Sequence, residues 1–285
     1  MPAAYVLTHL AITAAAIYIA ARVPGRRVVT AGLAVGLLLL VVGGMVIERS
    51  TALSWAAMRL GWPDLVFFTN LSLEGVALLL GGLWRQAATR GARWRAGVLA
   101  VPALCAALWS YAWFFRPLPP GLHGGVDRTG FCSQTTDDSC SAAAAVMLLH
   151  RHGIRSTEAE MARLCLTRAG HGTPPLGLYR GVATRARGAG LHPRLFILPD
   201  WSRLGTLPTP SILSIGLKRG APGEITQRME GYGWQPGHHH AVVVLAADPA
   251  GKWLDVADPS YGRERWPTAD IEYLWDGRAL VLDRR

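Results

Sequence analysis

The first 116 residues contain four apolar runs, each 20 residues long. A helix rises about 1.5 Å per residue, so a run of about 20 residues crosses the roughly 30 Å hydrocarbon core of a bilayer. Four such helices could not all be buried in so short a soluble domain. The sequence therefore predicts a bundle of four transmembrane helices. The predicted spans are Pro2–Ala21, Val28–Ile47, Leu65–Trp84 and Ala96–Phe115.

The charge distribution predicts the orientation of this bundle. Residues 1–116 hold 10 Arg and only three acidic residues, and the Arg side chains lie mainly in the short loops between the apolar runs. Three Arg follow the first run and four follow the third, against two between the second and the third. Basic loops stay in the cytoplasm, so both termini are expected outside it. We therefore expect a multi-pass protein of the plasma (inner) membrane whose C-terminal part is extracytoplasmic.

The net charge of +10 does not indicate nucleic-acid binding. Residues 117–285 are nearly balanced, with 19 basic and 16 acidic residues. Nucleic-acid binding requires basic side chains gathered on one face, whereas the excess here lies in the loops between the predicted spans. The expected partners are the lipid bilayer and a substrate, with no nucleic acid.

Glu74 lies in the middle of the third predicted span, one helical turn after Asn70. A charge at bilayer depth costs about 2.5–3.5 kcal/mol on insertion scales, so we expect Glu74 to face the bundle interior. It serves either a substrate or proton path or a polar contact between helices. The sequence does not choose between these two roles.

A Pro-rich linker at residues 117–121 separates this region from a second domain at 122–285. Helical patterns come first in that domain and apolar, β-branched runs follow, an order that favours an α+β fold. Thr157 and Glu160 have the spacing of a capping box. The predicted helices are Cys140–Gly153, one beginning at Thr157, and one from Pro174 to Ala189. The predicted strands are His192–Leu198, Pro210–Leu217, His238–Ala247, Trp253–Ala257 and Ala279–Asp283.

Four residues of this domain occur in an order that suits thiol catalysis: Gln134, Cys140, His240 and Asp258. The thiolate is the reactive form of cysteine, and both a helix N-terminus and a neighbouring imidazolium favour it. Cys140 opens a predicted helix, and His240 can supply the imidazolium. Asp258 would hold the imidazole in the correct tautomer. The side-chain amide of Gln134 and the backbone N–H of Cys140 would bind the developing oxyanion.

Three segments also resemble a known family, the bacteriocin-processing (double-glycine leader) cysteine peptidases, which have a papain-like fold. They are Gln134–Cys140, His240–Val244 at the start of an apolar strand, and Asp258–Gly262 with its Asp-Pro-x-x-Gly pattern. The resemblance covers roughly residues 122–285. It implies cleavage of a peptide or a leader peptide, no cofactor, and a separate transporter or export component as a partner.

The chain departs from the pattern of this family at several points. Ser141 stands where the family usually has Gly, and Ser139 stands where many members have Asp. The peptidase-like domain follows the predicted spans, whereas well-known members carry it ahead of theirs. No Gly-x-x-x-x-Gly-Lys-Ser/Thr segment occurs, so ATP-driven export by this chain alone is not expected.

Other interpretations fit the same residues. The triad could transfer an acyl group to an amine or amide, or the domain could bind peptides without turnover. Cys132 competes as the reactive thiol, or could form a disulfide with Cys140 or Cys165. His238 and His240 share one strand face and could bind a metal, but two ligands without a third are weak support for one.

Overall fold

The computed structural model describes residues 51–68, 112–198, 201–234 and 237–284, and scattered positions before residue 112. The chain divides into two compact units, of which one comprises Trp55–Pro63 and Pro117–Arg285. The four predicted spans, with Asn70 and Glu74, lie almost entirely outside the described residues. Among the residues described, no helix combines the length and the hydropathy needed to cross a membrane. The domain limits 1–116, 117–121 and 122–285 stay predictions.

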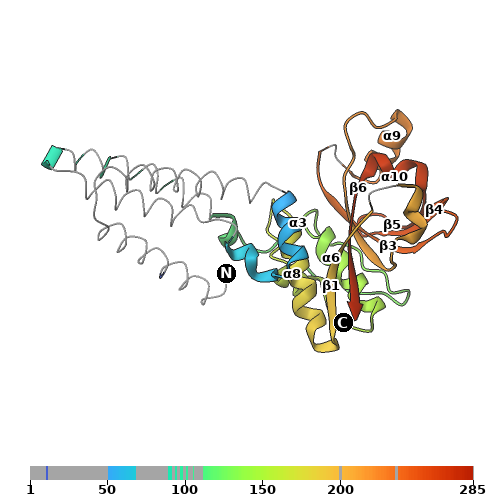
Figure 1. The fold of residues 1–285 in the computed structure, drawn as a ribbon, viewed down its shortest axis with the longest axis horizontal. Coiled ribbons are helices and arrows are strands. Elements are labelled where there is room, and N and C mark those ends of the chain that lie inside the picture. The colour runs from blue at the N-terminus through green and yellow to red at the C-terminus, as the bar shows by residue number, and fades with distance from the viewer. Residues whose placement is uncertain are drawn as a thin grey trace. The chain divides into compact units, whose positions relative to one another are not determined.

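The unit that contains the C-terminal residues is an α+β domain (Figure 1). Its α-helices are α6 (Cys140–Arg151), α7 (Glu158–Leu164), α8 (Pro175–Ala186), α9 (Gly223–Gly231) and α10 (Thr268–Leu274), and it also includes α3 (Thr51–Arg59) from Trp55 onward. Its strands are β1 (Leu191–Ile197), β2 (Ser211–Ile215), β3 (His240–Ala247), β4 (Trp253–Asp258), β5 (Gly262–Pro267) and β6 (Trp275–Arg284). The short 3-10 helices of the described residues are η1 (Pro63–Phe68), η2 (Ala112–Phe115), η3 (Arg187–Ala189) and η4 (Trp201–Thr206).

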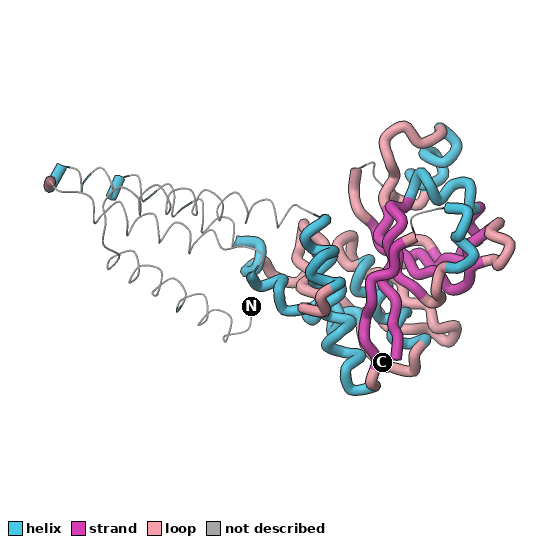
Figure 2. The backbone as a smooth tube through the Cα atoms, in the orientation of Figure 1, coloured by secondary structure: helices cyan, strands magenta, loops and turns pink. Residues whose placement is uncertain are grey.

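The strands form a single sheet in the order β1-β6-β2-β3-β4-β5, drawn in magenta in Figure 2. Every neighbouring pair is antiparallel. The last strand of the chain, β6, lies between β1 and β2. Helix α6 packs against β2 and β3, α8 packs against β1, and α7 contacts both helices. The sheet therefore carries α6 beside the strand that begins at His240.

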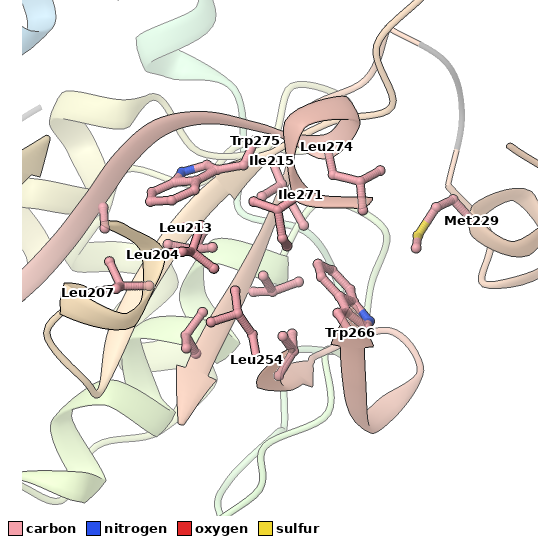
Figure 3. Close-up of a cluster of buried hydrophobic side chains, with 14 of the residues drawn as sticks. Leu204, Leu207, Leu213, Ile215, Met229, Leu254, Trp266, Ile271, Leu274 and Trp275 are labelled. Atoms are coloured by element: carbon pink, nitrogen blue, oxygen red, sulfur yellow. The ribbon is translucent and has the colours of Figure 1, made fainter. Parts of the chain in front are cut away.

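The opposite face of the sheet is covered by α9, α10 and η4. Alternate residues of a strand face opposite ways, so Leu213 and Ile215 of β2 point into this second layer, beside Val242 of β3. Figure 3 shows the cluster, with the indole rings of Trp266 and Trp275 among the aliphatic side chains. Both indoles are almost completely buried. This cluster packs against the middle of the sheet, including the strands that carry His240 and Asp258.

The predicted elements of this domain are confirmed, with shifts of a few residues at their ends. The three predicted helices correspond to α6, α7 and α8, the last ending at Ala186 before η3. The five predicted strands correspond to β1, β2, β3, β4 and β6. Thr157 caps α7 by accepting a hydrogen bond from the N–H of Glu160 at 3.2 Å. The Glu160 carboxylate forms an ion pair with Arg185 of α8.

Strand β5 and helices α9 and α10 were not predicted from the sequence. Strand β5 lies at the edge of the sheet and buries only Trp266, so its sequence lacks the apolar alternation of a half-buried strand. Helix α9 buries only Ile225 and Met229, and α10 only Ile271 and Leu274. Such narrow apolar stripes on short, polar helices give a weak periodic signal.

Candidate active site

Cys140 is the first residue of α6, and its helix is fixed at the centre of the domain. The following residues, 142–149, are all buried, because this helix is packed between the sheet and the neighbouring helices α7 and α8. The turn before it is closed by Ser139, whose hydroxyl donates to the Thr136 carbonyl at 2.8 Å and accepts from the Thr136 N–H at 3.1 Å. The Cys140 thiol thus lies at the positive end of a rigid helix.

His240 and Asp258 meet because a hairpin joins their strands. His240 is the first residue of β3, and Asp258 is the last residue of β4. The two strands are antiparallel, with Val243 opposite Ala257, so both residues lie at the same end of the sheet. His240 Nε2 is 2.7 Å from Asp258 Oδ1. The spacing of 18 residues in sequence is therefore that of a β-hairpin with a short connection.

Asp258 has a complete set of hydrogen-bond donors although its side chain is fully buried. Besides His240, the N–H and the hydroxyl of Ser260 donate to Oδ1 at 2.8 and 2.7 Å. The indole N–H of Trp234 donates to Oδ2 at 3.1 Å. Burial raises the pKa of Asp258, but the hydrogen bond and charge of His240 and the Ser260 donors outweigh it, so that its pKa is lowered overall. The carboxylate is therefore ionised beside the imidazole.

His240 and the Cys140 thiol lie close enough for each to shift the pKa of the other. Since Nε2 of His240 binds Asp258, the ring nitrogen left for the sulfur is Nδ1. Burial raises the pKa of the Cys140 thiol, but the neighbouring His240 and the Ala241 N–H lower it by more. Burial lowers the pKa of His240, but Asp258 and Cys140 together raise it to about 10. The arrangement favours a thiolate–imidazolium pair.

Gln134 lies next to this group through its backbone. Its N–H donates to the carbonyl of Pro259 at 2.9 Å, and Pro259 follows Asp258 directly. Its side-chain Nε2 donates to the Thr136 carbonyl at 3.1 Å. An amide nitrogen carries two N–H donors, so this bond leaves one for a substrate oxygen. Within the described residues, Gln134 Oε1 is buried without a hydrogen-bond partner.

A buried carboxylate holds the loop that carries Gln134. Glu158 is fully buried at the start of α7. Its Oε1 accepts from the N–H of Thr135 at 2.8 Å, and its Oε2 accepts from the Thr135 hydroxyl at 2.6 Å and from the Gly124 N–H at 2.8 Å. The Glu158 N–H in turn donates to the Gly124 carbonyl at 2.9 Å. The residue after Gln134 is thus bound at both its backbone and its side chain.

We expect Glu158→Gln to destabilise the domain by about 1–3 kcal/mol, because an amide replaces one acceptor by a donor and leaves a buried N–H unsatisfied. Thermal unfolding of the full-length chain measures the effect. Glu160→Gln, on the same helix but partly exposed in its ion pair with Arg185, is the control. It should change the stability by no more than about 0.5 kcal/mol. Equal melting temperatures for the two variants would contradict this role of Glu158.

Cys132 and Cys165 do not compete as nucleophiles. All four cysteines of the chain are free thiols, so the disulfides considered for Cys132 are not formed. Cys132 and Cys165 are fully buried, and burial raises the pKa of each thiol to about 12. A protonated, inaccessible thiol is a poor nucleophile. Cys140 is the described cysteine whose pKa is lowered rather than raised.

Trp234 is a site residue that the sequence pattern did not reveal. Besides its bond to Asp258, its ring lies 5.1 Å from the His240 ring, measured between centroids, and 5.7 Å from that of Trp266. It covers the His240–Asp258 pair on the side of the core. In the sequence, Trp234 is a tryptophan six residues before His240 that belongs to no motif.

The structure gives no support to the metal site considered for His238 and His240. His238 and His239 are exposed, and the described residues hold no group of three metal-ligating side chains.

No known family model matches the chain, and no curated protein matches it. Solved structures with a similar fold are peptidase or protease domains. The peptidase domain of Streptococcus ComA, a bi-functional ABC transporter involved in quorum sensing, is 18% identical, with a TM-score of 0.41 over 54% of this chain and 96% of that one. A double glycine motif protease from an AMS/PCAT transporter, in complex with the leader peptide, is 18% identical, with a TM-score of 0.40 over 60% of this chain and 99% of that one.

A third similar structure is the N-terminal peptidase C39 like domain of the toxin secretion ATP-binding protein from Vibrio parahaemolyticus. It is 15% identical, with a TM-score of 0.36 over 53% of this chain and 100% of that one. At these identities and TM-scores the likeness says nothing about which reaction this chain catalyses.

Proposed function

We propose that this chain is a membrane-anchored cysteine peptidase that cleaves peptide or leader-peptide substrates at Cys140. One observation carries the proposal: the Cys140 thiol and the His240 imidazole shift each other's pKa, and His240 Nε2 lies 2.7 Å from Oδ1 of the buried Asp258. The depressed pKa of the thiol and the raised pKa of the imidazole are the electrostatic properties that thiol catalysis requires.

The acylation step uses these groups as follows. The Cys140 thiolate attacks the carbonyl carbon of the scissile bond, so that a C–S bond forms and the carbonyl oxygen becomes an oxyanion. The Cys140 N–H and one N–H of Gln134 Nε2 stabilise this oxyanion. His240 Nδ1 gives its proton to the leaving nitrogen as the C–N bond breaks. A thioester on Cys140 and a free amine result.

Water completes the cycle. The neutral His240 takes a proton from a water molecule, the resulting hydroxide attacks the thioester, and the C–S bond breaks. The carboxylic acid product leaves, and the thiolate–imidazolium pair is restored. Asp258 keeps the ring oriented in both steps and stabilises its charged form.

A trapped acyl-enzyme is the direct test. Full-length chain incubated with peptides that contain a central Gly-Gly should release two fragments. Acid quenching followed by mass spectrometry should then find a thioester at Cys140. If added amines capture the acyl group in preference to water, the reaction is acyl transfer rather than hydrolysis. Neither fragments nor an adduct at Cys140 would contradict the proposal and favour a peptide-binding module.

The anchoring and the compartment belong to the same proposal. The four apolar runs and the Arg-rich loops after the first and third of them support four spans with the peptidase domain outside the cytoplasm. A reporter fused after Arg285 tests this orientation. We expect a periplasm-active reporter such as alkaline phosphatase to be active there. A cytoplasmic signal from green fluorescent protein at the same position would overturn the orientation and leave the triad chemistry untouched.

A further inference from the structure

Two tyrosines form an aromatic surface near the triad that the reaction scheme above does not use. The rings of Tyr232 and Tyr261 are 4.0 Å apart, measured between centroids, and are tilted by 32°. The side chain of Tyr261 is 58% exposed. Burial and the neighbouring Glu264 of β5 raise the pKa of Tyr232 to about 12. The partly buried ring of Tyr232 thus packs against a second ring that faces solvent.

Both tyrosines are tied closely to catalytic groups. Tyr232 is two residues before Trp234, whose indole donates to Asp258 and packs on His240. Tyr261 closes the turn after Asp258, with its N–H donating to the Asp258 carbonyl at 3.2 Å. Within that turn, the Pro259 carbonyl binds the N–H of Gln134. The aromatic surface therefore adjoins the His240–Asp258 side of the site rather than the body of α6.

The position of the general acid determines which part of a peptide passes over this side. His240 must give its proton to the leaving nitrogen, so that nitrogen lies within hydrogen-bond reach of the imidazole. The residues that follow the scissile bond continue from it, past the groups around His240. The residues before the scissile bond are attached to the carbonyl carbon and diverge in the opposite direction. The aromatic pair at the turn after Asp258, with Tyr261 exposed, is thus placed to meet the leaving segment.

We propose that Tyr261, supported by Tyr232, forms a specificity subsite for an aromatic or other planar apolar side chain on the leaving side of the scissile bond. This inference rests on the proposed peptidase function and deepens it. Aromatic pairs with centroids 4.5–7 Å apart add roughly 0.5–1.5 kcal/mol beyond area burial. That contribution corresponds to a preference of about 2- to 12-fold in kcat/KM over a small polar residue.

Substrates that differ only after the scissile bond test this subsite. In each peptide the segment through Gly-Gly is the same, and a single Phe occupies the first, second or third following position among Ser residues. An all-Ser peptide is the reference. For the full-length chain, kcat/KM should be about 2- to 12-fold higher for one of the Phe peptides than for the reference. Tyr261→Ala should reduce this ratio to about one, and Tyr261→Phe should retain it.

The control variant is Tyr273→Ala, which removes a half-buried tyrosine from α10 and should leave the ratio unchanged. A ratio near one in the unaltered chain, or an unchanged ratio in Tyr261→Ala, would overturn the subsite while peptide cleavage stands. An equal loss of rate on all four peptides in Tyr261→Ala would also contradict it, because that pattern indicates damage to the triad. If no peptide of the set is cleaved at all, the result contradicts the proposed peptidase function itself, and with it the subsite.

Discussion

Replacement of Cys140 by Ala is expected to abolish peptide cleavage, with a fall in kcat of about 10⁴-fold or more. The variant lacks the atom that forms the thioester, and neither Cys132 nor Cys165 can replace it. Cys132 and Cys165 are buried with pKa values raised to about 12. Fragment release from a quenched peptide measures the rate. Removal of the nucleophile of a triad costs about as much as removal of the whole triad.

Cys132→Ala is the matched control for this variant. It removes a sulfur eight residues upstream from a buried position, so it should reduce stability slightly and change kcat by no more than a few-fold. Significant residual cleavage in Cys140→Ala, or an equal loss in Cys132→Ala, would show that the nucleophile is assigned to the wrong residue. Binding of the same peptides to both variants separates loss of chemistry from loss of affinity.

Asp258→Asn is expected to reduce kcat by about 10²–10⁴-fold, the range expected when a triad carboxylate becomes an amide. The amide carries no charge to stabilise the imidazolium. Its NH₂ group would also face the N–H and O–H donors of His240, Trp234 and Ser260, which bind the carboxylate in the unaltered chain. The hydrogen bond and charge of Asp258 contribute to raising the pKa of His240 to about 10. Their loss lowers the pKa at which the imidazolium deprotonates, so the alkaline limb of kcat/KM should move to lower pH.

Ser260→Ala provides the comparison for Asp258→Asn. It removes one donor to Oδ1 at 2.7 Å but keeps the carboxylate and its bond to His240. Its kcat should fall by no more than about tenfold, and its alkaline limb should stay close to that of the unaltered chain. If Asp258→Asn kept both the rate and the alkaline limb, Asp258 would be a structural carboxylate rather than part of the triad.

The C-terminal domain shows which features can be predicted from the sequence. Helix α6 is apolar over nearly its whole length and β3 is a run of small and β-branched residues, so their patterns identify them without tertiary information. The candidate site residues could be identified from their order in the sequence, because each has a chemical role that few other residue types can fill. They are Gln134, Cys140, His240 and Asp258. The hairpin that joins His240 and Asp258 was implied by two strands separated by a turn.

The features that were not predicted depend on contacts between distant segments. Glu158 looked like an ordinary acidic residue in the first turn of a helix, and its bonds to Gly124 and Thr135 appear only when the loop is folded over α7. Trp234 precedes His240 without a motif, and its role depends on the approach of Asp258. Strand β5 is polar because the edge of a sheet has little to bury. Sequence patterns report burial along one segment, whereas these contacts are made between segments.

The rate at which iodoacetamide alkylates Cys140, followed by mass spectrometry of the full-length chain as a function of pH, tests the central claim most directly. A thiolate held beside an imidazolium should react at a pH well below the usual cysteine pKa of about 8.5. A second rise should follow near pH 10, where His240 loses its proton. In His240→Ala the first step should move up towards or beyond 8.5. A single transition at or above pH 8.5 in the unaltered chain, or no modification of Cys140, would contradict the account.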